Sequence, residues 1–158
     1  EAEHYSRKNE TGGIHWEVIP DLGKTLSGVT TFPQNVYPNS SDAIYLEYDM
    51  NFETTGEFPV HILVSPTLNF NANKGLRYAV SFDGGAEQIV NINEKYDMKL
   101  MEKWQANSIN ETITRHEIKT TGKHTLRFRV LEPGIVLQKI MIDLGGLKKS
   151  YLGAPEKM

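Results

Sequence analysis

The sequence predicts an all-β protein in which two antiparallel sheets pack face to face, with one short helix. Three observations carry this prediction: apolar and polar residues alternate along most of the chain, turn-forming residues separate the alternating runs, and one segment has helical spacing. A chain of 158 residues with a hydrophobic share of 39% can bury the core of one domain, and it is too short for two ordinary domains. We therefore expect a single sandwich.

The alternating runs define the expected strands. In the run 43–52, Leu46, Tyr48 and Met50 fall on one face, because successive side chains of a strand point to opposite sides. The run 58–64 follows a Thr-Gly turn and is expected to be its antiparallel neighbour, with the next run continuing a meander. The expected strands span 2–5, 14–19, 43–52, 58–64, 76–82, 88–92, 112–118, 124–130 and 135–144.

Two local signals complete this reading of the chain. Asp83-Gly84-Gly85 is a strong hairpin signal and is expected to join 76–82 to 88–92. The segment 94–107 breaks the alternation, since its apolar residues recur at three- and four-residue spacings, and it is expected to form the helix. These apolar residues are Tyr96, Leu100, Met101 and Trp104. One helix with eight to ten strands in two layers fits a jelly roll or a related sandwich.

The same patterns predict the core and the end of the domain. The sandwich is expected to span 1–144. The segment 145–158 loses the alternation and is expected to be an extension, packed on the sandwich or exposed. The residues expected to point into a shared core are Leu46, Tyr48, Met50, Leu126, Phe128, Ile140 and Ile142.

Composition excludes several classes of function. The formal net charge is −3 and no basic run is present, so the chain has no field that would attract nucleic acid. Its apolar runs are only a few residues long, well short of the roughly 20 needed to span a membrane. The absence of Cys excludes disulfides, thiolate metal sites and Cys nucleophiles. No motif of nucleophilic or metal-dependent catalysis is present either, so we expect no catalytic residue in this chain.

Aromatic and basic side chains are the candidates for binding. Sugar rings present apolar faces that stack on Trp or Tyr, and the aromatic candidates are Trp16, Tyr37 and Trp104. An acidic ligand would need a cation, and a guanidinium on a strand could grip a carboxylate; the candidates are Arg77, Arg127 and Arg129. Each has a structural alternative, because Trp is common in sandwich cores and Arg is common on outer faces of sheets.

Three carboxylates could form a metal site. Glu1 and Glu3 fall on one face of the expected first strand, and Asp143 ends the expected last strand. Ca²⁺ takes six to eight oxygen ligands, so this set predicts one structural calcium ion that ties the first strand to the last. The alternative is that all three are solvated edge carboxylates.

Longer stretches of the sequence resemble one family. The chain opens on Glu-Ala-Glu and nearly closes on an apolar strand ending in Asp, as carbohydrate-binding jelly rolls often do. The more distinctive stretches are 13–23, 26–33, 65–70, 75–83 and 146–153. Over essentially its whole length, the sequence resembles the C-terminal domain of glycoside hydrolase family 115, a jelly roll of the galactose-binding-like kind.

The resemblance implies a role for the domain. Family 115 enzymes are xylan α-1,2-glucuronidases that remove glucuronic acid or its 4-O-methyl form from glucuronoxylan, and their catalytic machinery lies upstream in a larger barrel-containing part. The resemblance therefore implies a non-catalytic accessory domain with a structural, dimerising or active-site-supporting role, whose partner is the catalytic domain of the same polypeptide. Carbohydrate-binding jelly rolls also commonly carry a structural calcium ion.

Two other readings stay open at this point. The first is an autonomous carbohydrate-binding module for xylan or glycans that bear uronic acids, which would need an exposed aromatic platform. The second is a small independent hydrolase, for which the sequence offers no nucleophile and base. A homodimer and a periplasmic or secreted location in a bacterium are further expectations from the resemblance.

Overall fold

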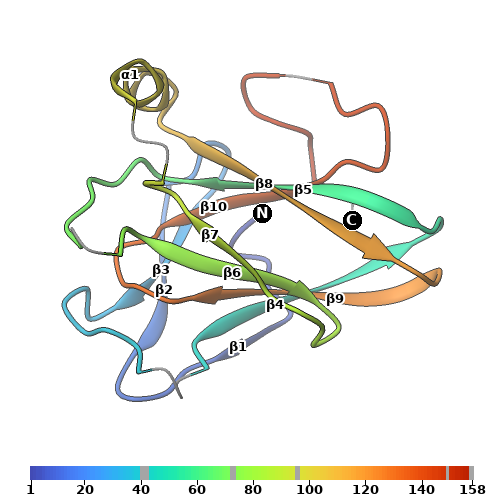
Figure 1. Ribbon diagram of the computed structural model, residues 1–158, viewed down its shortest axis with the longest axis horizontal. Helices are drawn as coiled ribbons and strands as arrows, with labels where there is room; N and C mark the ends of the chain where they lie inside the picture. The colour runs from blue at the N-terminus through green and yellow to red at the C-terminus, as the bar shows by residue number, and fades with distance from the viewer. Residues whose placement is uncertain (40–42, 72–73, 95–96, 149, 157–158) are drawn as a thin grey trace.

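The computed structural model describes residues 1–158 except 40–42, 72–73, 95–96, 149 and 157–158. The described chain forms two five-stranded antiparallel sheets and one short helix (Figure 1). Its elements are β1 (Arg7–Asn9), β2 (His15–Ile19), β3 (Gly28–Phe32), β4 (Tyr45–Phe52), β5 (Gly56–Val64), β6 (Arg77–Phe82), β7 (Gln88–Asn91), α1 (Met98–Asn107), β8 (Asn110–Ile118), β9 (Gly122–Val130) and β10 (Leu137–Ile142).

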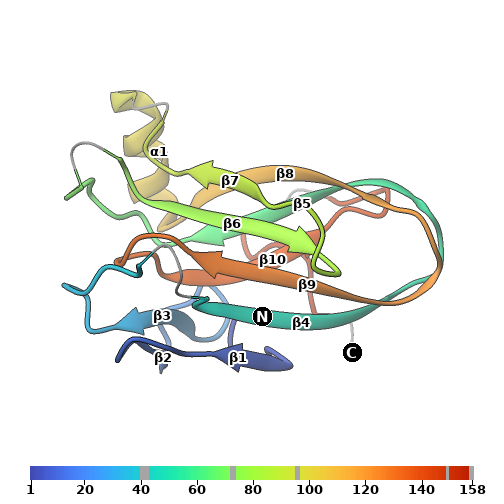
Figure 2. The same ribbon diagram turned by 60° about the horizontal axis from the view of Figure 1, so that its bottom comes forward.

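The two sheets form the layers of a jelly-roll sandwich, as the alternation predicts. The front sheet has the strand order β1-β4-β9-β6-β7, which Figure 2 shows from bottom to top. The back sheet has the order β2-β3-β10-β5-β8. Figure 1 places α1 and the C-terminal segment (residues 143–156) on the β5 and β8 side of the sandwich, away from β1 and β4. The helix α1 and the C-terminal segment therefore flank the surface beside β5, β8 and β10.

The core fills the space between the sheets. Alternate residues of β4 and β9 point inward, so that Leu46, Leu126 and Phe128 are fully buried. Phe128 packs against Tyr78 with ring centroids 4.8 Å apart, and against Trp16 at 6.5 Å. The largest fully buried side chains are Tyr78, Phe128, Ile44, Leu46, Ile62, Leu76, Leu126, Ile135, Leu137, Val29, Val60 and Val64.

The core prediction is correct for the residues at the centre of the sandwich, but the predicted residues at its edge are only partly buried. Leu46, Tyr48, Leu126 and Phe128 are buried, whereas Met50, Ile140 and Ile142 are partly exposed and pack against the edge of the core. Alternation assigns a residue to a face, but the position of that face under the opposite sheet decides its exposure. The alternation of apolar residues therefore does not by itself predict which inward-facing residues at the edge of the core are partly exposed.

The expected pairing of 43–52 with 58–64 is wrong. β4 pairs with β1 and β9, and β5 pairs with β8 and β10, so the chain crosses from one sheet to the other between them. This crossing brings Phe52 and Phe58 together between the layers, with ring centroids 5.7 Å apart. Turn residues mark a reversal of direction but do not tell a hairpin from an arch between sheets. The expected hairpin of β6 and β7 is present.

The structure corrects one further strand prediction and adds one strand that the alternation missed. Residues 2–5 form no strand; the first strand is β1, which pairs with the edge of β4. The strand β3 lies inside the back sheet, between β2 and β10, and nearly all its residues are buried. A strand buried on both faces shows no alternation, which is why β3 gave no period-two signal.

The helix α1 is short and lies on the surface. Its ten residues, all of them described, include none that is fully buried. Within the described residues, no helix is long and apolar enough to cross a membrane.

Candidate functional site

Helix α1 is held at both ends by its own sequence. The side chain of Asp97 caps the first turn by accepting a hydrogen bond from the backbone N–H of Lys99. Ser108 ends the helix in the left-handed conformation, and its N–H donates to the carbonyl of Gln105 at 3.2 Å. These caps fix the direction in which Trp104, in the last turn, faces.

Trp104 lies between two hollows of the surface. One face of α1 lines a pocket of about 80 Å³ with Met101, Trp104 and Gln105. The adjacent face of α1 lines a groove of about 500 Å³ with Leu100, Lys103, Trp104 and Asn107. Positions three and four apart share a face of a helix, which explains why these two sets interleave along α1. Trp104 is half-buried and belongs to both walls.

The pocket has amide side chains beside an aromatic ring. Its opposite wall is the loop after β5, with Pro66, Thr67, Leu68 and Asn69, together with Asn93 after β7. The side-chain oxygen of Asn93 accepts the N–H of Leu76 at 2.9 Å, and that of Asn69 accepts the N–H of Asn71 at 3.0 Å. Both amide side chains are thus oriented by the backbone. An aromatic face with oriented amides suits a neutral polyol such as a sugar unit.

The groove separates α1 from the C-terminal segment, which we define as residues 143–156. Its volume lies in the ordinary range of small-molecule sites. Tyr151 forms part of its far wall, and the Lys24 ammonium lies 3.7 Å from the centroid of that ring. Lys24 also donates to the carbonyl of Asn107 at 3.1 Å, so it bridges the two walls. Partial burial lowers the pKa of the Lys24 amine.

The groove carries charges of both signs. Lys24, Lys103 and Lys148 are its cationic residues. Its carboxylates are already engaged within the protein: Glu111 contacts His61 at 2.7 Å, and Asp143 accepts the N–H groups of Gly145 and Leu147 at 2.9 and 3.3 Å. An anion in the groove would pair with the ammonium groups, whereas the carboxylates already have hydrogen-bond partners within the protein.

Trp16 lies in the core. It is 5% exposed, its ring packs near Phe128, and its indole N–H donates to the carbonyl of Asn9 at 3.3 Å. A Trp on the inward face of β2 is buried by the front sheet, so its ring has no face left for a sugar. Tyr37 is 48% exposed but lines neither hollow. Of the three aromatic candidates, Trp104 is the one that lines these two hollows.

The candidate arginines hold the fold together. Arg77 binds Glu132 through both its guanidinium and its backbone N–H, and the Glu132 side chain is only 3% exposed. Arg129 pairs with Glu87 at 2.5 Å. Each guanidinium therefore already has a carboxylate partner, which leaves it unsuited to grip a uronic acid.

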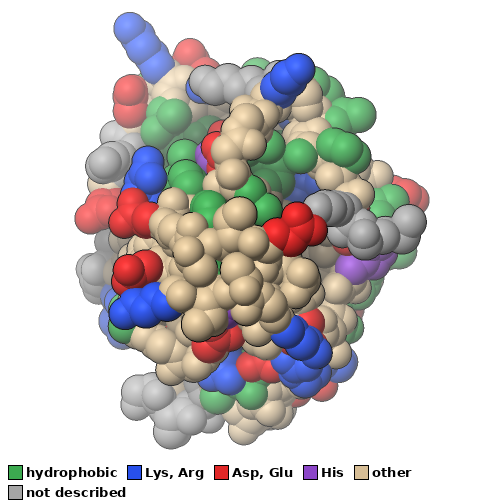
Figure 3. Space-filling model, turned by 90° about the vertical axis from the view of Figure 1, so that its right-hand side faces the viewer, with side chains coloured by type: hydrophobic (Ala, Val, Ile, Leu, Met, Phe, Trp, Pro, Cys, Tyr) green, Lys and Arg blue, Asp and Glu red, His purple; other side chains and the backbone are tan. Residues whose placement is uncertain are grey.

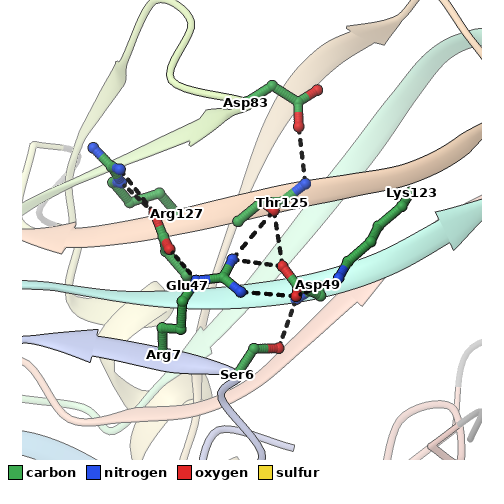
Figure 4. A network of polar contacts seen from close by, with 8 residues as sticks. All are labelled: Ser6, Arg7, Glu47, Asp49, Asp83, Lys123, Thr125 and Arg127. Atoms are coloured by element: carbon green, nitrogen blue, oxygen red, sulfur yellow. Dashed lines mark hydrogen bonds and ion pairs between the residues drawn. The ribbon is translucent and has the colours of Figure 1, made fainter.

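Arg127 belongs to a network on the outer face of the front sheet (Figure 4). It pairs with Glu47 at 2.7 Å, and Glu47 also accepts a hydrogen bond from Arg7 at 2.7 Å. Arg7 donates to Asp49 as well, which holds the pKa of that carboxyl well below its usual range. The network fastens the short edge strand β1 to β4 and β9.

The three carboxylates expected to bind calcium do not form one site. Glu1 contacts the ammonium of Lys139 at 3.0 Å and accepts the hydroxyl of Thr25. Glu3 accepts the N–H of Ser27 at 3.1 Å, and Asp143 accepts the two N–H groups of its own turn. Across the part of the chain that the structure describes, no three His, Asp or Glu residues gather as a group that could hold a metal ion.

Comparison with known proteins identifies the family. The family model of the glycosyl hydrolase family 115 C-terminal domain matches residues 1–156. The chain belongs to this family. No curated protein sequence matches the chain.

Solved structures show the same fold at low sequence identity. The chain is 17% identical to BtGH115A, a family GH115 4-O-methyl-α-glucuronidase with specificity for decorated arabinogalactans, with a TM-score of 0.69; the match covers 89% of this chain and 16% of that protein. A family 35 carbohydrate-binding module from Clostridium thermocellum is 19% identical, with a TM-score of 0.57 and coverage of 90% and 95%. The second family 6 module of Cellvibrio mixtus lichenase 5A, solved with cellotriose, is 18% identical, with a TM-score of 0.55 and coverage of 92% and 95%.

Several residues that line the two hollows of this family 115 C-terminal domain gave no signal in the sequence. Asn69 and Asn93 lie in loops and Gln105 lies on the surface of α1, where such amide residues are ordinary. Tyr151 and Lys24 are 127 positions apart and meet only because the C-terminal segment folds back over the sheet. The blocks 65–70 and 146–153 carried part of the family resemblance, and with the candidate Trp104 they are the signals that pointed toward these hollows.

Proposed function

We propose that this family 115 C-terminal domain is a non-catalytic accessory domain that contacts carbohydrate through the surface around Trp104. The observation that carries the proposal is the position of Trp104, half-buried between an amide-lined pocket and a lysine-bearing groove. An aromatic face with nearby amides and ammonium groups can stack on a sugar ring while binding its hydroxyls and carboxylates. The fold supports the proposal, because carbohydrate-binding modules share it.

The glycan class follows from the charges of the groove and from the family. Ammonium groups favour an acidic saccharide over a neutral one. Xylan that carries glucuronic acid is one candidate ligand, and the specificity of BtGH115A for decorated arabinogalactans makes those glycans the second. Both are outside the cell, so we propose a secreted or periplasmic protein in a bacterium. Its partner is the catalytic domain of the same polypeptide.

Replacing Trp104 by alanine tests the proposed site. We expect titration calorimetry with acidic oligosaccharides from glucuronoxylan or decorated arabinogalactan to show binding to the unaltered chain, and Trp104→Ala to weaken it roughly tenfold or more, because a stacked aromatic ring is a typical binding hot spot. Tyr37→Ala is the matched control, since Tyr37 is an exposed aromatic away from both hollows, and it should bind as before. Equal losses in the two variants would contradict the site.

The proposed lack of catalysis has its own test. The carboxylates of the groove are held by His61 and by backbone N–H groups, and two free carboxyl groups at a suitable separation would be needed for glycoside hydrolysis. We expect the purified 158-residue chain to release no 4-O-methylglucuronic acid from glucuronoxylan. Release above the level of a boiled sample, retained through further purification, would overturn the non-catalytic assignment.

A structural role is the second candidate function. Leu144, Tyr151 and Leu152 of the C-terminal segment are all more than half exposed. Figure 3 shows hydrophobic side chains gathered at the top of the molecule, the side on which Figure 1 places that segment. Such a surface could pack on the catalytic domain or on a second copy of this chain. Sedimentation of the chain as a monomer at all concentrations would exclude the second copy.

A further inference from the structure

We infer that Lys139 supplies the positive charge that joins the N-terminal segment (residues 1–6), β10 and the C-terminal segment, in place of the calcium ion that the resemblance to carbohydrate-binding jelly rolls implies. The inference rests on contacts within this chain. It does not depend on the proposed carbohydrate contact.

The residues present do not fit a calcium ion. Ca²⁺ needs six to eight oxygens at about 2.3–2.6 Å. Here the Glu1 carboxylate has the Lys139 ammonium at 3.0 Å, and a divalent cation in the same place would face that fixed positive charge. Glu3 and Asp143 use their carboxylates on backbone N–H groups. The Lys139 ammonium thus lies beside Glu1 where a metal would need to lie, and Glu3 and Asp143 already bind N–H donors elsewhere.

Lys139 contacts three parts of the chain at once. It belongs to β10, the central strand of the back sheet, where it pairs in register with Leu63. Its ammonium donates to the carbonyl of Leu152 in the C-terminal segment at 3.1 Å and binds Glu1 in the N-terminal segment. The adjacent backbone supports the same arrangement, because the N–H of Ala2 donates to the carbonyl of Gln138 at 3.2 Å.

Burial makes this pair different from a surface ion pair. The side chains of Lys139 and Glu1 are 4% and 6% exposed. Lysine is almost never buried unless it is paired, and removing one partner leaves a buried charge without compensation. The hydroxyl of Thr25 donates to both oxygens of Glu1, at 2.8 and 2.7 Å, and completes the set around that carboxylate. The two segments are therefore fastened by a charge that is covalently part of the strand between them.

Calcium dependence of the melting temperature tests the inference first. The chain for this test is extended by a few residues before Glu1, so that no terminal amine lies there. We expect its melting temperatures in excess calcium chloride and in excess chelator to differ by no more than about 1 °C. A bound calcium ion at a hundredfold excess over its Kd would raise the melting temperature by several degrees, roughly 5–10 °C for a domain of this size. Such a rise would overturn the inference.

Substitutions test the role of Lys139 itself. We expect Lys139→Met and Glu1→Gln each to lower the melting temperature by several degrees, and the double variant to lose clearly less than the sum of the two losses, because it leaves no buried charge unpaired. Lys148→Met, which removes an exposed lysine of the same segment, is the control and should melt unchanged. Additive losses in the double variant, or an unchanged Lys139→Met, would overturn the inference. If a single variant fails to fold, the calcium comparison on the unaltered chain still decides it.

Discussion

Replacing Phe128 by alanine is expected to lower the free energy of unfolding by about 3–5 kcal/mol, the usual cost of removing a fully buried aromatic side chain. Phe128 has no exposed surface and packs against Tyr78 and Trp16, which come from both sheets. The cavity left behind would therefore lie between the layers. Because a domain of this kind is stable by only about 5–15 kcal/mol, this loss would be a large part of its stability. Urea denaturation followed by circular dichroism measures it.

Ile140→Ala is the matched comparison for Phe128→Ala. Ile140 alternates in step with the core but is only partly buried, so we expect a cost clearly below that of Phe128→Ala, at the low end of the range for large-to-small changes, about 2 kcal/mol or less. A cost for Ile140→Ala equal to or above that for Phe128→Ala would place the centre of the core elsewhere.

Replacing Arg77 by alanine is expected to cost stability rather than carbohydrate affinity. Its guanidinium and backbone N–H both bind Glu132, whose side chain is 3% exposed. Breaking a buried ion pair costs about 3–5 kcal/mol. The Arg77 side chain is 33% exposed, and solvent screening there reduces our expectation to about 2–4 kcal/mol.

The double variant separates the buried charge from other effects of the Arg77 substitution. In Arg77→Ala/Glu132→Gln the neutral amide can still accept the backbone N–H of Arg77, so we expect part of the lost stability to return. Oligosaccharide binding should be the same in both variants as in the unaltered chain. A selective loss of binding with unchanged stability would restore Arg77 as a ligand residue.

The fold could be predicted from the sequence because its signals are local. Alternation placed most of the strands, and the Asp-Gly-Gly sequence placed the β6–β7 hairpin. What failed was the assignment of neighbours, as for β4 and β5, because a turn between two apolar runs serves a hairpin and a crossing between sheets equally well. The fully buried β3 lacked alternation for the same physical reason that parallel-sheet strands do.

The candidate site was less predictable because it depends on contacts between distant segments. Residue type marked both Trp16 and Trp104 as candidates, and only the packing of the sheets shows that the first is in the core and the second at the surface. Each arginine candidate has a carboxylate partner that residue type alone does not show: Glu47 faces Arg127 in register across β4 and β9, whereas Glu132 follows β9 and Glu87 lies between β6 and β7. Lys139 lies in an apolar run, where nothing in the sequence shows that it meets Glu1.

Carbohydrate contact around Trp104 is tested most directly by two-dimensional NMR of the isotopically labelled chain, titrated with the acidic oligosaccharides. The two tryptophans provide separate indole N–H signals, and that of Trp16 is an internal control because it is buried and bound to Asn9. We expect the Trp104 indole signal to shift, together with backbone signals of Asn69, Asn93 and Tyr151, while the Trp16 indole and the Tyr37 backbone signal stay in place. Shifts confined to residues away from both hollows, or no shift with any of these oligosaccharides, would contradict the proposed site.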